Sequence, residues 1–309
     1  MARTKIKIGT RNSKLALWQA NFVADLLDEN GFQPELIPIE TKGDKILNVA
    51  ISKIGSKGVF TEELERMLAD GEIDIAVHSA KDLQSTLPDG FHVLAFCERE
   101  SPEDVIVSDR EINLEDSTLI LGTSSTRRIA MLKHFYPALS TVDVRGNLQT
   151  RIEKLRTGIM HGLVLAYAGV NRMGYDTMIK HWFDTDRFVP PVGQGAIAVE
   201  VHESLAEGIR ENVRQICNHT LTERRILAER AFLKRMDGGC SIPVFGFAEV
   251  EQDGQLMLTG GITSLNGKEM VKRTLHGKDP EQLGLALGEE VLKSGGDRIL
   301  SDIKNTGIT

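Results

Sequence analysis

The sequence predicts an α/β protein of three domains: two doubly wound sheets, followed by a small three-stranded sheet with helices. Two observations support this fold class. Strand-like and helix-like segments alternate through the first 190 residues, and three strand-like segments separated by turns follow over 243–275. The chain of 309 residues is long enough for two or three domains of ordinary size.

The first domain is expected to occupy residues 1–98 and about 194–216. Apolar residues from Leu15 to Leu26 recur at helical spacing, and Gly31 should end that helix. The polar, glycine-interrupted stretch 41–57 is expected to be a long, mobile loop. The remaining expected elements are strands at 5–10, 35–40 and 73–78, and a helix that begins at a Thr61 cap and ends at Gly71.

The second domain is expected to occupy residues 102–190, after a hinge at 98–102. The segment 190–195, which contains two prolines, should cross back to the first domain. The expected elements are strands at 119–122, 141–144 and 163–166, and helices at 126–134 and 147–157.

The third domain is expected to occupy residues 219–309. A long helix from Thr220 to Gly238 should lead into a hairpin-rich sheet, because Asp253-Gly254 and Asn266-Gly267 are turn sequences. The expected elements of this sheet are strands at 243–251, 255–263 and 268–275, with a covering helix at 280–293.

Charge and composition exclude several classes of function. The net charge is −7, yet the segment 121–160 carries seven basic and two acidic residues, or +5. A basic segment in an acidic chain indicates a local site for an anionic ligand and argues against nucleic acid as a partner. No apolar run is long enough for a membrane span or a signal peptide, so a cytoplasmic location is expected.

Metal, disulfide and nucleotide chemistry have little support in the sequence. The cysteines Cys97, Cys217 and Cys240 are widely spaced, and the eight histidines show no metal-binding pattern. Residues 193–198 match the letters of a dinucleotide motif, but two prolines precede them and a strand-like run follows. The stretch 261–268 is more simply a hairpin turn than a phosphate loop. We expect neither a metal nor a nucleotide.

Two strand-to-helix junctions of the second domain indicate an anion site. The stretches 122–128 and 145–147 each follow a strand and open a helix, whose free backbone N–H groups and dipole attract anions. Because the carboxyl ends of strands face one crevice, the arginines there should converge, with two polar residues of the first domain opposite them. These residues are Arg127, Arg128, Arg145 and Arg151 on one side, and Arg11 and Ser13 on the other. The alternative is that the arginines are solvated charges at helix ends.

Asp82 directly follows the buried strand 73–78, so its carboxylate should lie at the mouth of the same crevice. There it could balance a developing positive charge. On spacing alone, a structural aspartate that caps the next turn is an equal alternative.

Six motifs resemble, in order, the signatures of the hydroxymethylbilane synthase (porphobilinogen deaminase) family. They are Thr10-Arg11-Asn12-Ser13 with Leu15 to Gln19, Val77 to Asp82, Gly122 to Arg128, Arg145-Gly146-Asn147 with Thr150-Arg151, Val192 to Ala196, and Gly238-Gly239-Cys240. The resemblance spans almost the whole chain. It implies that the first two domains are similar to type-II periplasmic binding proteins.

The resemblance also implies an activity in tetrapyrrole (haem) biosynthesis. Four porphobilinogen molecules would be deaminated and condensed one by one onto a dipyrromethane cofactor. The linear tetrapyrrole hydroxymethylbilane would then be released by hydrolysis, and a uroporphyrinogen III synthase would receive it. The cofactor would be joined to Cys240 by a thioether.

Roles for individual residues follow from the same resemblance. Asp82 is the implied catalytic acid. The implied cofactor-binding residues are Cys240, Lys81, Ser125, Arg127, Arg128, Arg145 and Asn147. The implied substrate-binding residues are Arg11, Ser13, Arg151, Arg172 and Gln194, and the implied active-site loop spans about 42–58, with Lys53, Lys57 and the neighbouring Phe60.

One position departs from the family pattern. Gln84 stands where the family usually has a proline, which would fix the exit from the strand. The loop that carries Asp82 should therefore be less rigid.

The residue types suit this chemistry. Porphobilinogen carries an acetate and a propionate, so each condensation adds two negative charges that arginines can bind. Asp82 would balance positive charge on the pyrrole nitrogens and shuttle a proton. Two other classes remain open: a solute-binding module, which would need the arginines but not Asp82 or Cys240, and a Rossmann oxidoreductase, which rests only on the motif at Gly193.

Overall fold

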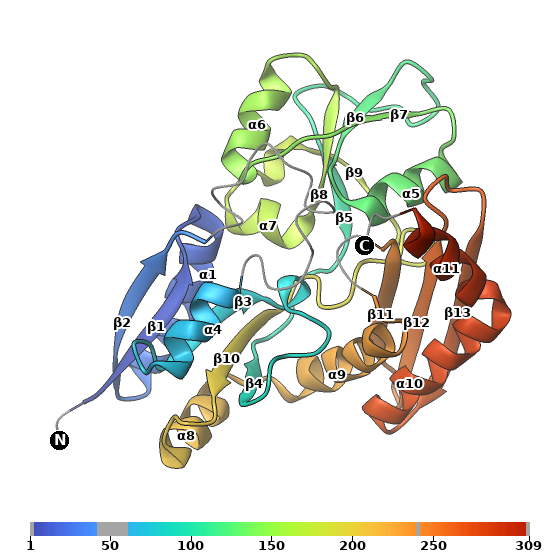
Figure 1. The fold of residues 1–309 in the computed structure, drawn as a ribbon. Coiled ribbons are helices and arrows are strands. Elements are labelled where there is room, and N and C mark those ends of the chain that lie inside the picture. The colour runs from blue at the N-terminus through green and yellow to red at the C-terminus, as the bar shows by residue number, and fades with distance from the viewer. Residues whose placement is uncertain (1–2, 42–60, 239–241, 307–309) are drawn as a thin grey trace.

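The computed structural model describes residues 3–41, 61–238 and 242–306. Three separate sheets organise this part of the chain, and we call each sheet with its helices a lobe (Figure 1). The strand orders are β2-β1-β3-β10-β4 in the first lobe, β7-β6-β8-β5-β9 in the second and β11-β12-β13 in the third. This confirms the predicted fold class, whereas the residue boundaries of the domains stay predictions.

The first lobe is a mixed sheet. Strands β1, β2 and β3 are parallel, and β10, which follows the second lobe in the chain, pairs antiparallel with β3 and β4. Buried Ile6 and Ile8 of β1 pack against Val23 and Leu27 of α1, which gives this lobe its core. The elements are β1 (Thr4–Arg11), α1 (Lys14–Glu29), β2 (Phe32–Ile39), α4 (Glu62–Ala69), β3 (Ile75–Ser79), a 3-10 turn (Ala80–Asp82), β4 (Phe91–Phe96), β10 (Ile197–His202) and α8 (Glu207–Cys217).

The second lobe repeats this plan. Strands β6, β7 and β8 are parallel, and β5 pairs antiparallel with β8 and β9. The elements are β5 (Asp104–Val107), β6 (Ile120–Gly122), α5 (Thr126–Phe135), β7 (Ser140–Val142), α6 (Leu148–Arg156), β8 (Gly162–Ala166), α7 (Tyr167–Arg172), a 3-10 turn (Asp176–Met178) and β9 (Ile179–Trp182).

The third lobe packs helices on a three-stranded antiparallel sheet. A Cβ at Gly246 or Gly260 would come within 3.0 or 2.9 Å of the Phe232 ring, so these glycines let α9 lie close to the sheet. The elements are α9 (Thr220–Arg235), β11 (Val244–Val250), β12 (Leu256–Thr263), β13 (Met270–Gly277), α10 (Pro280–Val291), a π-helical turn (Leu292–Gly296) and α11 (Asp297–Asn305).

Several local expectations need correction. Thr61 precedes α4, but its side chain makes no capping hydrogen bond; its hydroxyl lies 3.5 Å from the side-chain nitrogen of Gln84 instead. The sequence reading also missed β4, β5, β9, α7, α8 and α11. Gly193 and Gly195 have positive φ, and the strand β10 follows them. A dinucleotide motif would need a helix at this place, so its rejection is confirmed.

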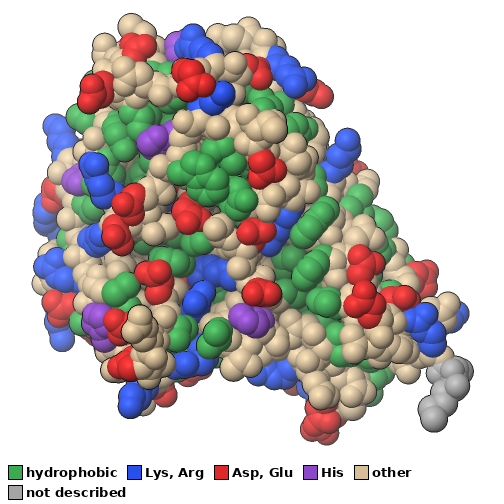
Figure 2. All heavy atoms as spheres, turned by 180° about the vertical axis from the view of Figure 1, so that it is seen from behind, with side chains coloured by type: hydrophobic (Ala, Val, Ile, Leu, Met, Phe, Trp, Pro, Cys, Tyr) green, Lys and Arg blue, Asp and Glu red, His purple; other side chains and the backbone are tan. Residues whose placement is uncertain are grey.

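Acidic and basic side chains are interspersed on the face turned away from the viewer in Figure 1 (Figure 2). No helix within the described ranges is both long and apolar enough to cross a membrane. The same ranges contain no group of three or more histidine, cysteine or acidic side chains arranged to hold a metal ion.

Candidate active site

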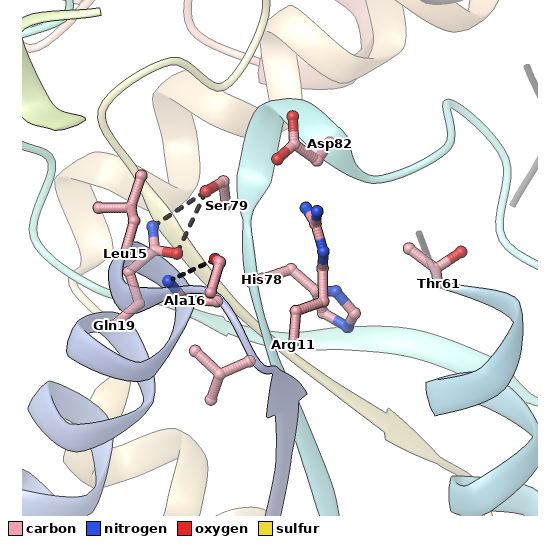
Figure 3. Close-up of a pocket in the computed structure, with 10 residues that line it drawn as sticks. Arg11, Leu15, Ala16, Gln19, Thr61, His78, Ser79 and Asp82 are labelled. Carbon is pink, nitrogen blue, oxygen red and sulfur yellow. Dashed lines mark hydrogen bonds between the residues drawn. The ribbon is translucent and has the colours of Figure 1, made fainter. Parts of the chain in front are cut away.

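A pocket lies at the carboxyl ends of β1 and β3 in the first lobe (Figure 3). These strands are parallel neighbours, so the residues that follow them meet at one edge of the sheet. Arg11, Ser13, His78 and Asp82 all line the pocket. In Figure 3 the guanidinium of Arg11 extends into the same space as the carboxylate of Asp82.

Asp82 ends the 3-10 turn that follows β3, and its side chain is exposed while Ala80 and Leu83 beside it are buried. The amide of Ala80 donates to the carbonyl of Ala196 at 3.0 Å, which ties the turn to the segment before β10. Within the described residues the Asp82 carboxylate accepts no hydrogen bond. It therefore does not cap the following turn, which was the alternative to a catalytic role.

Three of the predicted polar residues cap helix N-termini. The Oγ of Ser13 accepts from the Ala16 amide at 3.2 Å, and the Oγ of Ser125 from the Arg128 amide at 3.5 Å. Asn147 Oδ1 accepts from the Thr150 amide at 2.9 Å. Each cap uses an oxygen as acceptor and leaves the hydroxyl or amide hydrogens able to donate to an anion.

Arg127 and Arg128 are not solvated charges at a helix end, because both bind the fully buried carboxylate of Asp104. Arg128 donates to Asp104 Oδ1 at 2.7 and 3.0 Å, and Arg127 Nη2 donates to Oδ2. The remaining Nη1 donors reach the carbonyls of Val189 and Val164. The two arginines hold the pKa of Asp104 well below its usual range despite its burial.

Gln194 and Lys81 extend this network to the first lobe. The fully buried Gln194 donates from Nε2 to Asp104 Oδ1 at 3.0 Å and accepts from Lys81 Nζ at 3.4 Å. The pKa of Lys81 is lowered to about 8, mainly by burial and secondly by the positive charge of Arg128. Gln194 thus connects the lobes and does not point into open space.

Arg145 and Arg151 lie around the N-terminus of α6. Arg145 Nε donates to Asp143 Oδ2 at 3.1 Å, and Arg151 Nε donates to the carbonyl of Gly146 at 2.9 Å. The pKa of Arg151 is lowered to about 10, mainly by burial and secondly by the positive charge of Arg128. The negative charge of Asp82 acts in the opposite direction and raises this pKa. The structure thus brings Arg151 and Lys81 into the electrostatic reach of Asp82.

Arg172 lies where the two large lobes touch. Its Nη2 donates to the carbonyl of Gly195 at 2.8 Å, and its guanidinium lies 5.3 Å from the centre of the Trp18 ring. It therefore bridges α7 to α1, and its Nε is buried without a partner among the described residues.

The remaining predicted residues, Lys53, Lys57, Phe60 and Cys240 with the loop 42–58, lie outside the described residues. The two described cysteines are buried, as expected of small apolar residues. Burial raises the pKa of the Cys97 thiol to about 12 and also raises that of Cys217. Neither is suited to nucleophilic chemistry.

Sequence reasoning missed the acids that organise the site. Asp104 opens the apolar strand β5, where a charged residue is unexpected. That position is the signal that could have identified it. Glu229 on α9 is fully buried and pairs with Arg99 at 2.5 Å, which no local pattern indicates.

Comparison with known proteins decides the family. Residues 6–209 match the profile "Porphobilinogen deaminase, dipyromethane cofactor binding domain", and residues 224–293 match "Porphobilinogen deaminase, C-terminal domain". The chain belongs to the porphobilinogen deaminase family. Similar members include the porphobilinogen deaminases of Desulfosudis oleivorans (51% identity, 99% of this chain and 100% of that protein) and Cytophaga hutchinsonii (50% identity, 97% of each).

Solved structures similar to this family member include solute-binding proteins. An ancestral cationic amino acid solute binding protein matches with a TM-score of 0.41 and 13% identity, over 68% of this chain and 87% of that one. A TRAP periplasmic solute binding protein from Ochrobactrum anthropi matches with a TM-score of 0.40 and 13% identity, over 100% and 83%.

Proposed function

We propose that this chain is a hydroxymethylbilane synthase: it deaminates and condenses four porphobilinogen molecules onto a dipyrromethane cofactor and releases hydroxymethylbilane by hydrolysis. Its membership of the porphobilinogen deaminase family supports this activity. Cys240 is the proposed attachment point of the cofactor, and a uroporphyrinogen III synthase the proposed recipient of the product.

The described residues fit such a cofactor. A dipyrromethane assembled from two porphobilinogens carries four carboxylates, which need several donors in one place. Lys81, Arg128 and Arg145 supply cations, and Ser125 and Asn147 supply a hydroxyl and an amide at the N-termini of α5 and α6. We propose that these residues hold it, and that Arg127 contributes indirectly, through Asp104.

When bound, the cofactor supplies the free pyrrole position to which the first substrate is joined. The residues proposed to hold the carboxylates of porphobilinogen and of the growing chain are Arg11, Ser13 and Arg151, with Arg172 and Gln194 keeping the lobes in register around them. Residues of the loop 42–58, with Lys53, Lys57 and Phe60, are proposed to close over the substrate.

Asp82 carries the proposed chemistry. Departure of ammonia from porphobilinogen leaves a cationic, electrophilic pyrrole, and the exposed carboxylate of Asp82 would stabilise that charge on the ring nitrogens. After the new carbon–carbon bond forms, the ring carbon must lose a proton, which the same carboxylate can accept. The observation that carries this proposal is the position of Asp82. Its carboxylate does not cap a turn and lies in the same pocket as Arg11.

Single-turnover assays on protein loaded with preformed tetrapyrrole test this role. Asp82→Asn keeps the shape but removes the charge, so the rate of porphobilinogen condensation should fall on the order of 10²–10³-fold. Asp82→Glu keeps the charge and should retain more activity. Both variants should still carry the covalent adduct. A loaded Asp82→Asn protein with the wild-type rate would refute the catalytic role.

A further inference from the structure

The turn that carries Asp82 is held from the third lobe. Arg230 of α9 donates from Nη2 to the carbonyl of Gln84 at 2.8 Å, two residues beyond Asp82. Leu83, between them, is buried in a cluster that includes Ile226, one helical turn before Arg230 on α9. A single face of α9 therefore fixes the chain on the C-terminal side of Asp82.

A buried polar cluster lies beneath this anchor. His78 Nε2 is 3.0 Å from Glu200 Oε2, and both side chains are almost completely buried. The side-chain nitrogen of Gln84 lies 3.4 Å from Glu65 Oε1 of α4. Arg230 is also within electrostatic reach of Glu200 in this cluster.

This anchor takes the place of a covalent constraint. Leu83 has φ −73° and ψ 142°, an extended conformation that a following proline would enforce. Gln84 imposes no such restriction, so the burial of Leu83 and the hydrogen bonds of Gln84 hold the exit from the turn. The guanidinium–carbonyl bond from Arg230 is the shortest of those that Gln84 makes.

We infer that Arg230 is a positioning residue for Asp82, which sets the place of the catalytic carboxylate from a different lobe. This inference rests on the proposed role of Asp82. Arg230 does not touch the reacting atoms; it acts by fixing the backbone that carries them. Displacing a reacting group by about 1 Å can cost on the order of 100-fold in rate, so a loosened turn should slow the chemical step.

The experiment compares Arg230→Met and Arg230→Lys in full-length, adduct-bearing protein. We expect Arg230→Met to lower the single-turnover rate on the order of 10- to 100-fold. KM for porphobilinogen and the mass of the adduct should stay unchanged. Arg230→Lys keeps a donor and should recover most of the loss. The matched control is Arg224→Met on the same helix. The Arg224 guanidinium donates to the carbonyl of Gly254, in the turn between β11 and β12, at 2.9 Å. Its removal should leave the single-turnover rate unchanged.

The decisive arm repeats Arg230→Met in an Asp82→Asn background. If Arg230 acts through Asp82, the additional loss should shrink to less than about twofold, because residues that act through one another are not additive. Should Arg230→Met fail to fold, Gln84→Gly loosens the same exit and carries the same expectation.

Two results would overturn the inference while the proposed role of Asp82 stands. The first is that Arg230→Met has the wild-type single-turnover rate while Asp82→Asn is slow. The second is that Arg230→Met lowers the rate by the same factor in the wild-type and in the Asp82→Asn background. A wild-type rate for Asp82→Asn itself would instead remove the proposed role of Asp82.

Discussion

Asp104 shows how a single residue sets the behaviour of a basic site. Arg127 and Arg128 both donate to it, Gln194 donates to the same carboxylate, and Lys81 joins through Gln194. A fully buried acid among several cations lowers their mutual repulsion and fixes their positions before a ligand binds. Sequence reasoning could name these cations from the two strand-to-helix junctions. It did not connect Asp104 with them, because the partners of Asp104 lie 23 to 90 residues away in the sequence.

Replacing Asp104 should therefore cost stability. Asp104→Asn leaves two buried guanidinium groups without a counter-charge, and we expect the free energy of unfolding to fall by about 3–5 kcal/mol. Urea denaturation measures this loss. Asp116→Asn is the control, because Asp116 is exposed and, among the described residues, its carboxylate accepts hydrogen bonds from Thr118 alone. The unfolding midpoint of this variant should be close to wild type. Equal midpoints for the two variants would contradict the buried network.

Lys81 predicts a pH dependence of ligand binding. Its pKa in the fold is about 8, below the ordinary value of 10.5, so Lys81 loses its charge at a lower pH than an ordinary lysine does. A bound carboxylate should raise that pKa, so binding takes up a proton and affinity falls as the pH rises above about 8. Titrating hydroxymethylbilane into Cys240→Ala protein from pH 7 to 9.5 measures this effect. Lys81→Gln should remove it, whereas Lys180→Gln, at an exposed ion pair, should not. A profile that Lys81→Gln leaves unaltered would exclude Lys81 as its source.

Helices and strands with strong local patterns were predicted well. The expected strands at 5–10 and 163–166 and the helix at 126–134 match β1, β8 and α5 to within two residues, because local periodicity determines them. Short strands such as β5 and β9 were not predicted, since their pairing depends on partners distant in sequence. For β10, the sequence predicted a return of the chain at 190–195 and a strand-like run after it, but not the antiparallel pairing with β3 and β4.

Gly193 couples this return segment to the Asp82 turn. Its φ is +77°, and a Cβ there would lie 2.9 Å from both the carbonyl carbon of Ala80 and the amide nitrogen of Lys81. Gly193→Ala should therefore displace the turn and lower the single-turnover rate, in addition to any loss of stability. Gly174→Ala is the control: its φ is +70° but no atom lies within 4 Å of the added Cβ, so it should lose only about 1–2 kcal/mol of stability. Equal rates for the two variants would mean that the turn tolerates the displacement.

Across the whole molecule, the lobes meet at a buried acid. Glu229 of α9 accepts from Arg99, which follows β4, and from the backbone amides of Gly193 and Ala248. One carboxylate from the third lobe thus joins the first lobe, the return segment and β11. Periodicity in the sequence predicted the division into three lobes. It could not predict these contacts, because they join residues that are far apart in the chain.

The central claim is that the folded protein carries a covalent two-pyrrole cofactor on Cys240. The intact mass of the purified protein tests it most directly, with Cys240→Ala and the buried-cysteine variants Cys97→Ala and Cys217→Ala beside it. We predict that wild type, Cys97→Ala and Cys217→Ala exceed their sequence masses by one dipyrromethane, and that Cys240→Ala has its sequence mass. An unmodified wild-type protein, or a full adduct on Cys240→Ala, would contradict the account.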